Sequence, residues 1–306
     1  MVGLLFPGQG SQLVGMGREL AEAFPEARRT FEEADDTLGF ALSQVAWNGP
    51  EDELTATSIA QPAILTHSIA VVRVMADRLD DIAYGAGHSL GEFTAYVAAG
   101  ALSFADGLRT VRLRGELMQR AGEERPGAMA AVLGLDEDKV EAVCERASTE
   151  GSICVPANYN SPNQLVISGD VAAVERAMEL AKEAGARRSL RLNVSGAFHS
   201  PLMKVAEEGL AAQLDAITFE RPRFPIISNV TAKPVSEPDA ARRLLLEQLT
   251  SAVRWTASMH TMIDAGVKQF YELGPGNVLA GLLRRIERSA HVQSIGSPAE
   301  LEGAVA

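Results

Sequence analysis

Ser89 lies in the stretch whose residue types are best suited to chemistry, Gly87-His88-Ser89-Leu90-Gly91. A short apolar run at 82–84 precedes this Gly-x-Ser-x-Gly pattern, and a helical pattern at 93–99 follows it. In a strand-turn-helix context the glycines permit close packing, and the serine hydroxyl projects from a strained turn. The N-terminus of the helix adds a positive dipole and backbone N–H groups that suit a developing oxyanion. The pattern therefore predicts a nucleophilic serine.

Two other interpretations of the same stretch stay open at this point. The serine could cap a helix after a glycine-rich turn that has no catalytic role. Alternatively, Gly85-Ala86-Gly87 begins like the dinucleotide fingerprint G-x-G-x-x-G. The third glycine of that fingerprint is due at Leu90 and arrives one residue late, at Gly91, which argues against a dinucleotide site.

His199 is the best candidate for a base that would activate Ser89. It stands in a loop of small residues, Gly196-Ala197-Phe198-His199-Ser200, which leave room around the imidazole. The other histidines stand in helix or strand patterns or, in one case, directly beside the serine, where neighbouring side chains diverge on a turn. They are His67, His88, His260 and His291. No Asp or Glu stands out as the third member of a triad.

Arg114 is the most informative charge in the chain. It lies on the apolar face of a helix predicted from Ser103 to about Gln119, three residues after Val111 and four before Met118. A guanidinium among apolar neighbours needs a carboxylate, and its own turn of helix supplies none. A ligand carboxylate could fill that place; an arginine that snorkels to the surface is the alternative.

Alternating strands and helices must position these residues. Val2–Phe6 reads as a buried strand, and the loop Pro7–Gln12 after it can present backbone N–H groups. A long apolar helix is predicted at 58–79. Past the Arg114 helix, 122–127 is predicted to be a linker. These elements indicate a layered α/β fold.

The region after that linker has a compact pattern of its own. The predicted elements are a strand at 128–133, a helix at 136–147, strands at 153–158 and 164–168, a helix at 171–184 and a strand at 187–194. This is the ferredoxin-like order β-α-β-β-α-β, which indicates an insert. The layered pattern then resumes with helices at 202–214, 238–249 and 255–265 and strands at 224–228 and 267–273, and Gly274-Pro275-Gly276-Asn277 is predicted to open a final long helix.

Composition sets further bounds on the function. With 306 residues, 46% of them apolar, the chain can bury a large core, and no apolar run is long enough to cross a bilayer. The N-terminus does not resemble a signal peptide, so we expect a cytoplasmic protein. Cys144 and Cys154 lack metal-type spacing, so we expect no metal site. The net charge of −12 disfavours nucleic acid and membrane as partners.

Seven motifs follow one another along nearly the whole chain. They are Phe6-Pro-Gly-Gln-Gly-Ser-Gln12, Gly87-His-Ser-Leu-Gly-Glu92, Leu113-Arg114-Gly115, Ala157-Asn-Tyr-Asn-Ser-Pro162, Gly196-Ala-Phe-His-Ser200, Gln248 ahead of Val253-Arg-Trp255, and Tyr271-Glu-Leu-Gly-Pro-Gly276. This ordered set resembles the malonyl-CoA:acyl-carrier-protein transacylases of fatty-acid synthesis. The resemblance implies an α/β-hydrolase-like large domain, residues 1–123 and 195–306, with an inserted ferredoxin-like small domain, residues 124–194.

The resemblance also implies roles for individual residues. Ser89 would be the nucleophile and His199 its base, and the backbone carbonyl of Gln248 would accept the imidazole N–H where other families use an acid. The backbone N–H groups of Gln9 and Leu90 would form the oxyanion hole. Further positions that match this family's substrate site are Arg114, for the malonyl carboxylate, and Met118, Phe198, Asn158 and Asn160. Phe198 fits the malonyl-selective form of its loop.

The implied activity is transfer of malonyl from malonyl-CoA to the phosphopantetheine thiol of an acyl carrier protein through a malonyl-serine intermediate. The two thioesters are substrates, no cofactor is implied, and we expect a monomer. The alternatives are an acyltransferase of polyketide synthesis, a serine thioesterase, and a catalytically silent acyl-binding subunit. An acidic carrier would need a local basic surface, and the candidate clusters are Arg187, Arg188 and Arg191, and Arg284 with Arg285.

Overall fold

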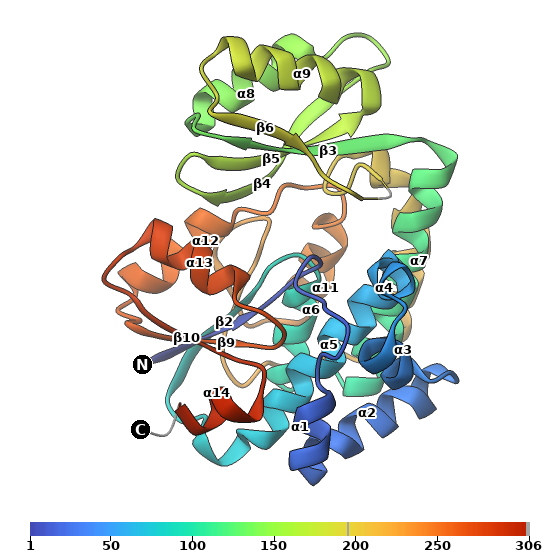
Figure 1. Cartoon of the computed structure of the whole chain (residues 1–306), viewed down its shortest axis with the longest axis vertical. Coiled ribbons are helices and arrows are strands. Elements are labelled where there is room, and N and C mark those ends of the chain that lie inside the picture. The colour runs from blue at the N-terminus through green and yellow to red at the C-terminus, as the bar shows by residue number, and fades with distance from the viewer. Residues whose placement is uncertain (195, 304–306) are drawn as a thin grey trace.

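The computed structural model describes residues 1–194 and 196–303 and contains two β-sheets, one in each of two stacked bodies (Figure 1). The larger sheet has six strands in the order β10-β9-β1-β2-β7-β8, and the smaller has four in the order β4-β5-β3-β6. Ser195 and residues 304–306, which belong to the second predicted segment of the large domain, lie outside the described residues.

The larger body contains both ends of the described chain. Its strands are β1 (Val2–Phe6), β2 (Ile82–Gly87), β7 (Ile226–Ile227), β8 (Pro234–Val235), β9 (Gln269–Leu273) and β10 (His291–Ile295). Its helices are α1 (Arg18–Ala23), α2 (Pro25–Leu38), α3 (Leu42–Asn48), α4 (Glu51–Thr55), α5 (Thr57–Val74), η1 (Ala76–Arg78), α6 (Leu90–Ala98), α7 (Phe104–Glu124), η2 (Pro201–Ala206), α10 (Glu207–Ala216), α11 (Pro238–Glu247), α12 (Trp255–Asp264), α13 (Val278–Ile286) and α14 (Pro298–Gly303).

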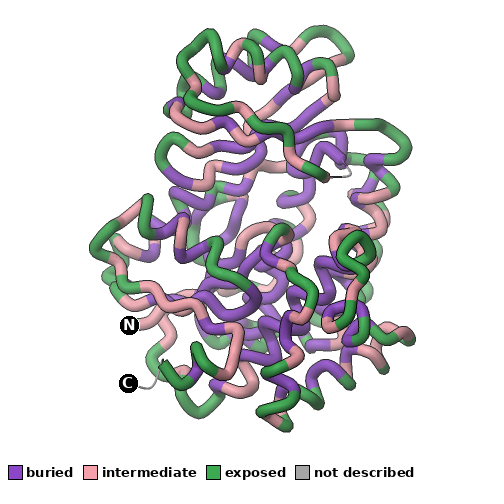
Figure 2. The backbone as a smooth tube through the Cα atoms, viewed as in Figure 1, coloured by how far each residue is buried: buried purple, intermediate pink, exposed green. Residues whose placement is uncertain are grey.

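Strand β1, inside the larger sheet, is a continuous apolar run and is packed on both faces, as is typical of parallel sheets. Strands β10, β9, β1, β2 and β7 run parallel, and only β8 is antiparallel to its neighbour. Alternate residues of β1 enter different cores: Leu4 packs with α5 and α6, and Leu5 packs with Trp255 and Met259 of α12. Figure 2 shows the buried residues concentrated around this sheet. The result is a three-layer arrangement that brings the carboxyl ends of β1 and β2 together.

Helix α7 begins where its capping box predicts. Ser103 Oγ accepts a hydrogen bond from the Asp106 backbone N–H at 3.0 Å and donates one to the Asp106 carboxylate at 2.8 Å. The helix continues to Glu124, so the prediction of a linker at 122–127 is wrong for its first half. Ala121 and Gly122 extend the buried face of the helix by a further turn, and this packing outweighs the low helix propensity of glycine.

The smaller body contains the predicted succession of strands and helices. Its elements are β3 (Gly127–Leu133), α8 (Glu137–Ala147), β4 (Cys154–Ser161), β5 (Gln164–Asp170), α9 (Val171–Glu183) and β6 (Arg188–Arg191). All neighbouring strands are antiparallel, and α8 and α9 pack on one face over a separate apolar core. Strand β6 is shorter than predicted: the Leu192 N–H still donates to the Met129 carbonyl of β3 at 2.9 Å, but residues 193–194 leave the sheet and line a cavity between the bodies.

The C-terminal region differs from its prediction. The helix after Gly276 is α13, which ends at Ile286, and strand β10 and helix α14 follow it, so the expected final long helix is wrong. Strand β10 lies at the sheet edge with most residues partly exposed, and its polar sequence gives little strand signal.

Strand β4 of the smaller sheet also touches the larger body. Asn158 forms an isolated parallel bridge with Val253, where the Tyr159 N–H donates to the Val253 carbonyl at 2.9 Å. This contact fixes the smaller sheet above the carboxyl edge of the larger one. Among the residues that the structure describes, no helix combines the length and apolarity needed to span a bilayer.

Candidate active site

Ser89 stands between β2 and α6 in a conformation that few side chains adopt. Its φ of 54° and ψ of −109° lie outside the common regions, as is typical of strained functional positions. Gly91 makes the turn possible, since a Cβ at this position would lie 2.1 Å from the Phe6 carbonyl oxygen of the neighbouring strand. The helix therefore starts directly against β1, and the serine is held at the sheet edge.

His199 meets Ser89 across 110 residues of sequence. The Ser89 hydroxyl lies 2.7 Å from His199 Nε2, and Nδ1 of the same ring faces the carbonyl oxygens of Gln248 at 3.0 Å and Ser251 at 3.2 Å. Two acceptors at Nδ1 require the proton there, which leaves Nε2 free to accept the serine proton. His199 also has a positive φ of 57°, so both partners of this pair sit on strained backbone.

The environment keeps this imidazole neutral. Burial, and then the positive charge of Arg114, lower the pKa of His199 to about 3. The ring is therefore unprotonated at neutral pH and can act as a base. The hydrogen bonds to the Gln248 and Ser251 carbonyls raise this pKa only in part, because a carbonyl carries no full negative charge.

Arg114 points into the site and is 1% exposed. Its Nη1 donates to Gln61 Oε1 at 2.8 Å, and its Nη2 donates to Gln248 Oε1 at 2.9 Å and to the Ser89 hydroxyl at 3.1 Å. Within the described ranges no carboxylate lies within ion-pair distance of it, so the guanidinium has only neutral hydrogen-bond partners. Burial lowers the pKa of Arg114 to about 10, and the group stays charged at neutral pH. A buried cation beside a nucleophile is suited to an anionic substrate.

A network of buried polar side chains that the sequence did not reveal holds the Ser89 turn and Gln248 in place. Asn229 accepts the Ser89 backbone N–H at 2.7 Å and donates to the Gly87 carbonyl at 2.7 Å, so it holds both sides of the turn. Glu92, on the first turn of α6, accepts from the Gln248 side-chain amide at 2.7 Å and from the Asn229 N–H at 3.2 Å. The one available signal was Glu92 itself, a charge within an otherwise apolar helix.

The two predicted oxyanion donors lie beside the serine. Leu90 is the first residue of α6, and the Ser89 side chain does not cap the helix. Within the described part of the chain, the backbone N–H groups of Gln9 and Leu90 have no hydrogen-bond acceptor. Both residues border the same cavity as Ser89, so these N–H groups can serve a ligand oxygen.

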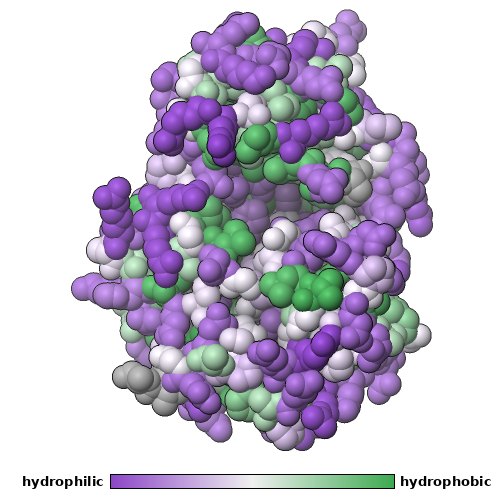
Figure 3. Space-filling view, viewed as in Figure 1, coloured by the Kyte–Doolittle hydropathy of each residue, from purple (hydrophilic) through white to green (hydrophobic). Residues whose placement is uncertain are grey.

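A cavity of about 390 Å³ joins these groups and opens between the two bodies, where Figure 3 shows a hollow. Of the predicted substrate-binding residues, Arg114, Met118, Phe198, Asn158 and Asn160 all line it. Asn160 faces His88, whose Nε2 lies 2.8 Å from Asn160 Oδ1, and this contact turns His88 away from the serine. The prediction that His88 is not the base therefore agrees with the geometry.

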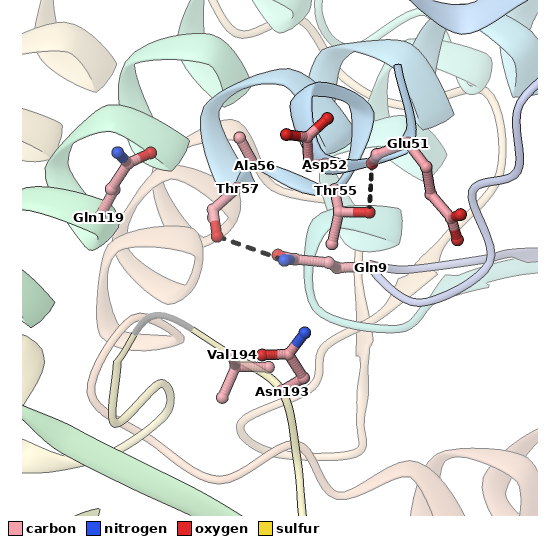
Figure 4. A pocket seen from close by; sticks show the side chains of 9 residues that line it. All are labelled: Gln9, Glu51, Asp52, Thr55, Ala56, Thr57, Gln119, Asn193 and Val194. Atoms are coloured by element: carbon pink, nitrogen blue, oxygen red, sulfur yellow. Dashed lines mark hydrogen bonds between the residues drawn. The ribbon is translucent and has the colours of Figure 1, made fainter. Parts of the chain in front are cut away.

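A second hollow of about 690 Å³ adjoins this cavity at Gln9, Thr55, Asn193 and Val194 (Figure 4). There the Gln9 side chain donates to Thr57 Oγ1 at 3.2 Å, so it is held at the wall while its backbone borders the site. In residues 1–194 and 196–303, no group of three or more histidine, cysteine or acidic side chains could hold a metal ion.

The site thus brings together a serine hydroxyl, a neutral imidazole and two backbone N–H groups that have no acceptor among the described residues, an arrangement that could carry out acyl transfer. Residues 4–303 match the family described as the acyl transferase domain. The chain belongs to the acyl transferase family. A relative of this acyl transferase, the malonyl CoA-acyl carrier protein transacylase of Bacillus subtilis, is 47% identical over 304 residues, which are 99% of this chain and 96% of the relative.

Solved structures agree with this family assignment. An acyl carrier protein S-malonyltransferase from Vibrio cholerae superposes on the acyl transferase with a TM-score of 0.95 and 41% identity, and the match covers 99% of both chains. A malonyl-transacylase in complex with its type II PKS acyl-carrier protein matches with a TM-score of 0.96 and 43% identity, covering 99% of this chain and 98% of that one. The mixed α/β fold is therefore that of the family.

Proposed function

We propose that this acyl transferase moves malonyl from malonyl-CoA to the phosphopantetheine thiol of an acyl carrier protein. The observation that carries the proposal is the buried guanidinium of Arg114, whose Nη2 lies 3.1 Å from the Ser89 hydroxyl and has no carboxylate partner among the described residues. Malonyl differs from neutral acyl groups by one carboxylate, and a planar guanidinium can bind that group through two parallel hydrogen bonds. The relatives are named for the same transfer.

The chemistry follows from the hydrogen bonds of the site. His199 Nε2 takes the proton of the Ser89 hydroxyl while Oγ attacks the thioester carbonyl carbon. The carbonyl oxygen becomes an oxyanion, which accepts hydrogen bonds from the backbone N–H groups of Gln9 and Leu90. The C–S bond then breaks, the imidazolium returns its proton to the departing CoA sulfur, and malonyl stays on the serine. In the second half-reaction the carrier thiol gives its proton to His199 and attacks the malonyl-serine ester. The C–O bond then breaks, and the Ser89 oxygen takes back the proton.

Nucleophile, base and oxyanion donors all come from the chain, so we propose that the two thioesters are the only small partners and that no cofactor takes part. We propose residues 1–123 and 195–306 as an α/β-hydrolase-like domain and 124–194 as a ferredoxin-like insert, which the strand order of the smaller sheet supports. We also propose a cytoplasmic monomer.

A carrier protein of polyketide synthesis is a second candidate acceptor, because one of the similar structures holds such a carrier with its transacylase. The site chemistry would be the same for either carrier. Transfer rates to the two kinds of carrier, measured side by side, would distinguish them.

The test is a two-stage transfer assay. The protein is incubated with malonyl-CoA, and unreacted malonyl-CoA and released CoA are removed. Carrier protein with its phosphopantetheine arm is then added. We expect one equivalent of CoA to be released in the first stage and malonyl-carrier to form in the second. Free malonate without malonyl-carrier would indicate a thioesterase, and no release of CoA would indicate a silent acyl-binding subunit.

A further inference from the structure

Gln248 contributes three different groups to the hydrogen bonds of the site, and its orientation therefore matters to the whole site. Its backbone carbonyl accepts from the His199 ring, its Oε1 accepts from Arg114, and its Nε2 donates to Glu92 at 2.7 Å. We infer that Glu92 is a positioning residue, which orients the Gln248 amide so that its oxygen meets Arg114 and fixes the guanidinium for the substrate carboxylate. The inference rests on the proposed function, since it concerns how the malonyl group is selected.

The hydrogen bonds leave only one orientation of this amide. If it were turned over, the Gln248 NH₂ group would face the Arg114 guanidinium and its oxygen would face the Glu92 carboxylate, which places donor against donor and acceptor against acceptor. Glu92 accepts at 2.7 Å, while the Ser89 carbonyl accepts from the same Nε2 at 3.0 Å. Carboxylates are the stronger acceptors, so the Glu92 contact dominates the choice.

Glu92 is itself held in place and cannot follow a moving amide. It is 0% exposed and lies in the first turn of α6, the helix that begins directly after Ser89. The same oxygen that meets Gln248, Oε2, also accepts the backbone N–H of Asn229 at 3.2 Å. Glu92 therefore ties the turn at Ser89 to the segment that presents Gln248, over 156 residues of sequence.

The geometry indicates that Glu92 acts by orienting the Gln248 amide and not by its negative charge. No ion pair joins Glu92 to Arg114 within the described ranges, and Gln248 stands between them. Burial raises the pKa of Glu92 to about 7, against the opposing effects of Gln248, Asn229 and Arg114. In either protonation state one carboxyl oxygen can accept from Gln248, so a neutral acceptor of the same shape should preserve the arrangement.

The experiment compares two substitutions of Glu92. Glu92→Gln keeps an acceptor oxygen, and its NH₂ group can take the place of Oε1, which has no hydrogen-bond partner in the part of the chain that is described. Glu92→Met fills similar space without an acceptor. Tyr96→Phe is the matched control, because it removes a buried hydroxyl from the same helix that also has no partner among the described residues.

The readout is the ratio of kcat/KM for malonyl-CoA to that for acetyl-CoA. We expect Glu92→Met to lower this ratio about 10-fold or more, the scale of a lost hydrogen bond to a charged group. Glu92→Gln should stay within about 3-fold of the parent, as should Tyr96→Phe, since the amide still finds its acceptor. If both substrates fall equally in Glu92→Met, Glu92 only supports the fold; if Glu92→Gln falls as far as Glu92→Met, charge and not orientation is its contribution. Either result overturns the inference.

Gln248→Met completes a double-mutant cycle. Because Glu92 is inferred to act through Gln248, the change in ratio for the double variant should equal that of Gln248→Met alone, and additive effects would overturn the inference. If Glu92→Met does not fold, Gln248→Met alone is measured. An unchanged ratio of kcat/KM for malonyl-CoA to that for acetyl-CoA in this variant contradicts the inference. A parent that transfers no malonyl would instead contradict the proposed function, so the two failures are distinct.

Discussion

Arg114 is the residue at which substrate choice should be decided. Arg114→Ala removes the partner of the malonyl carboxylate, and we expect a loss of malonyl transfer of about 3–5 kcal/mol, the range for breaking a buried charged pair. Acetyl transfer should fall little or rise, because an unpaired buried charge has gone. Arg114→Lys should restore only part of the activity, since an ammonium group lacks the planar fork. Competition between malonyl-CoA and acetyl-CoA measures the ratio of the two transfer efficiencies in each variant. Equal losses for both substrates would show that Arg114 supports the fold and does not select the substrate.

His199 should remain able to act as a base at pH values well below the ordinary pKa of a histidine imidazole. A lowered pKa means that the ring stays neutral as the pH falls, and only the neutral ring can accept the serine proton. The rate of acyl-enzyme formation should therefore show no loss attributable to imidazole protonation between about pH 8 and pH 5. Glu92→Gln serves as the control, because it removes a buried carboxyl group whose pKa is raised to about 7 and whose titration could otherwise be mistaken for that of the imidazole. An acidic limb near the ordinary histidine pKa in both proteins would contradict the assignment.

Residue types and local context were enough to point to Ser89, His199 and Arg114, but not to the groups that hold them. Ser89 stands in a recognisable turn, and Arg114 interrupts an apolar face. Asn229 and Glu92, by contrast, act on partners 140 and 156 residues away, Ser89 for Asn229 and Gln248 for Glu92. Their side chains carry no local pattern that marks a role, because the role depends on how β7 and α11 pack beside α6.

At the scale of elements, the close approach of α6 to β1 determines where the nucleophile stands. A Cβ on Gly91 would lie 2.1 Å from the Phe6 carbonyl oxygen and 2.9 Å from its carbon, and backbone atoms cannot move aside cheaply. We expect Gly91→Ala to lower the free energy of unfolding by about 1–3 kcal/mol or more, and to reduce acylation by displacing the helix.

Gly281→Ala is the matched control for this prediction. Gly281 lies in the interior of α13, and a Cβ there would meet no atom within 4 Å. Alanine should stabilise this helix by about 0.5–1 kcal/mol. Thermal unfolding of both variants measures the difference, and a Gly91→Ala protein as stable and active as the parent would contradict the account of the turn.

The elements themselves were predictable where burial is complete. Strand β1 is buried along nearly all its length and agrees with its predicted bounds, and the capping box of α7 marks its start. Strand β7 falls within the strand predicted at 224–228 but is only two residues long, and β8, also two residues long, is too short for a period to appear. Their position depends on pairing beside β2, which is tertiary information.

At the scale of the whole molecule, the charge distribution indicates where an acidic carrier would dock. Arg187 and Arg188 of the smaller body and Arg285 of the larger one line a hollow of about 460 Å³. Arg285 donates to Gln164, which also borders the site cavity. The fold thus brings two arginines of the first predicted cluster, Arg187 and Arg188, together with Arg285 of the second, whereas Arg191 pairs with Glu175. On a chain of net charge −12, this is a local basic surface beside the active site.

Charge reversal tests this docking surface. Arg188→Glu and Arg285→Glu should slow delivery of malonyl to the carrier more than they slow acylation by malonyl-CoA, and the effect should weaken with added salt. Arg29→Glu, on the exposed surface of α2, is the control and should change neither step. Stopped-flow rates for the two half-reactions provide the comparison, and equal losses in both would rule the surface out as a carrier site.

The most direct test of the account is the identity of the acylated residue. The protein is treated with labelled malonyl-CoA, quenched, digested and mapped by mass spectrometry, in parallel with Ser89→Ala and His199→Ala. We expect the label on the peptide that contains Ser89, none in Ser89→Ala, and acylation about 10²–10⁴-fold slower in His199→Ala, as for a lost general base. A label on any other residue, or labelling that persists in Ser89→Ala, would contradict the central claim that malonyl passes through Ser89.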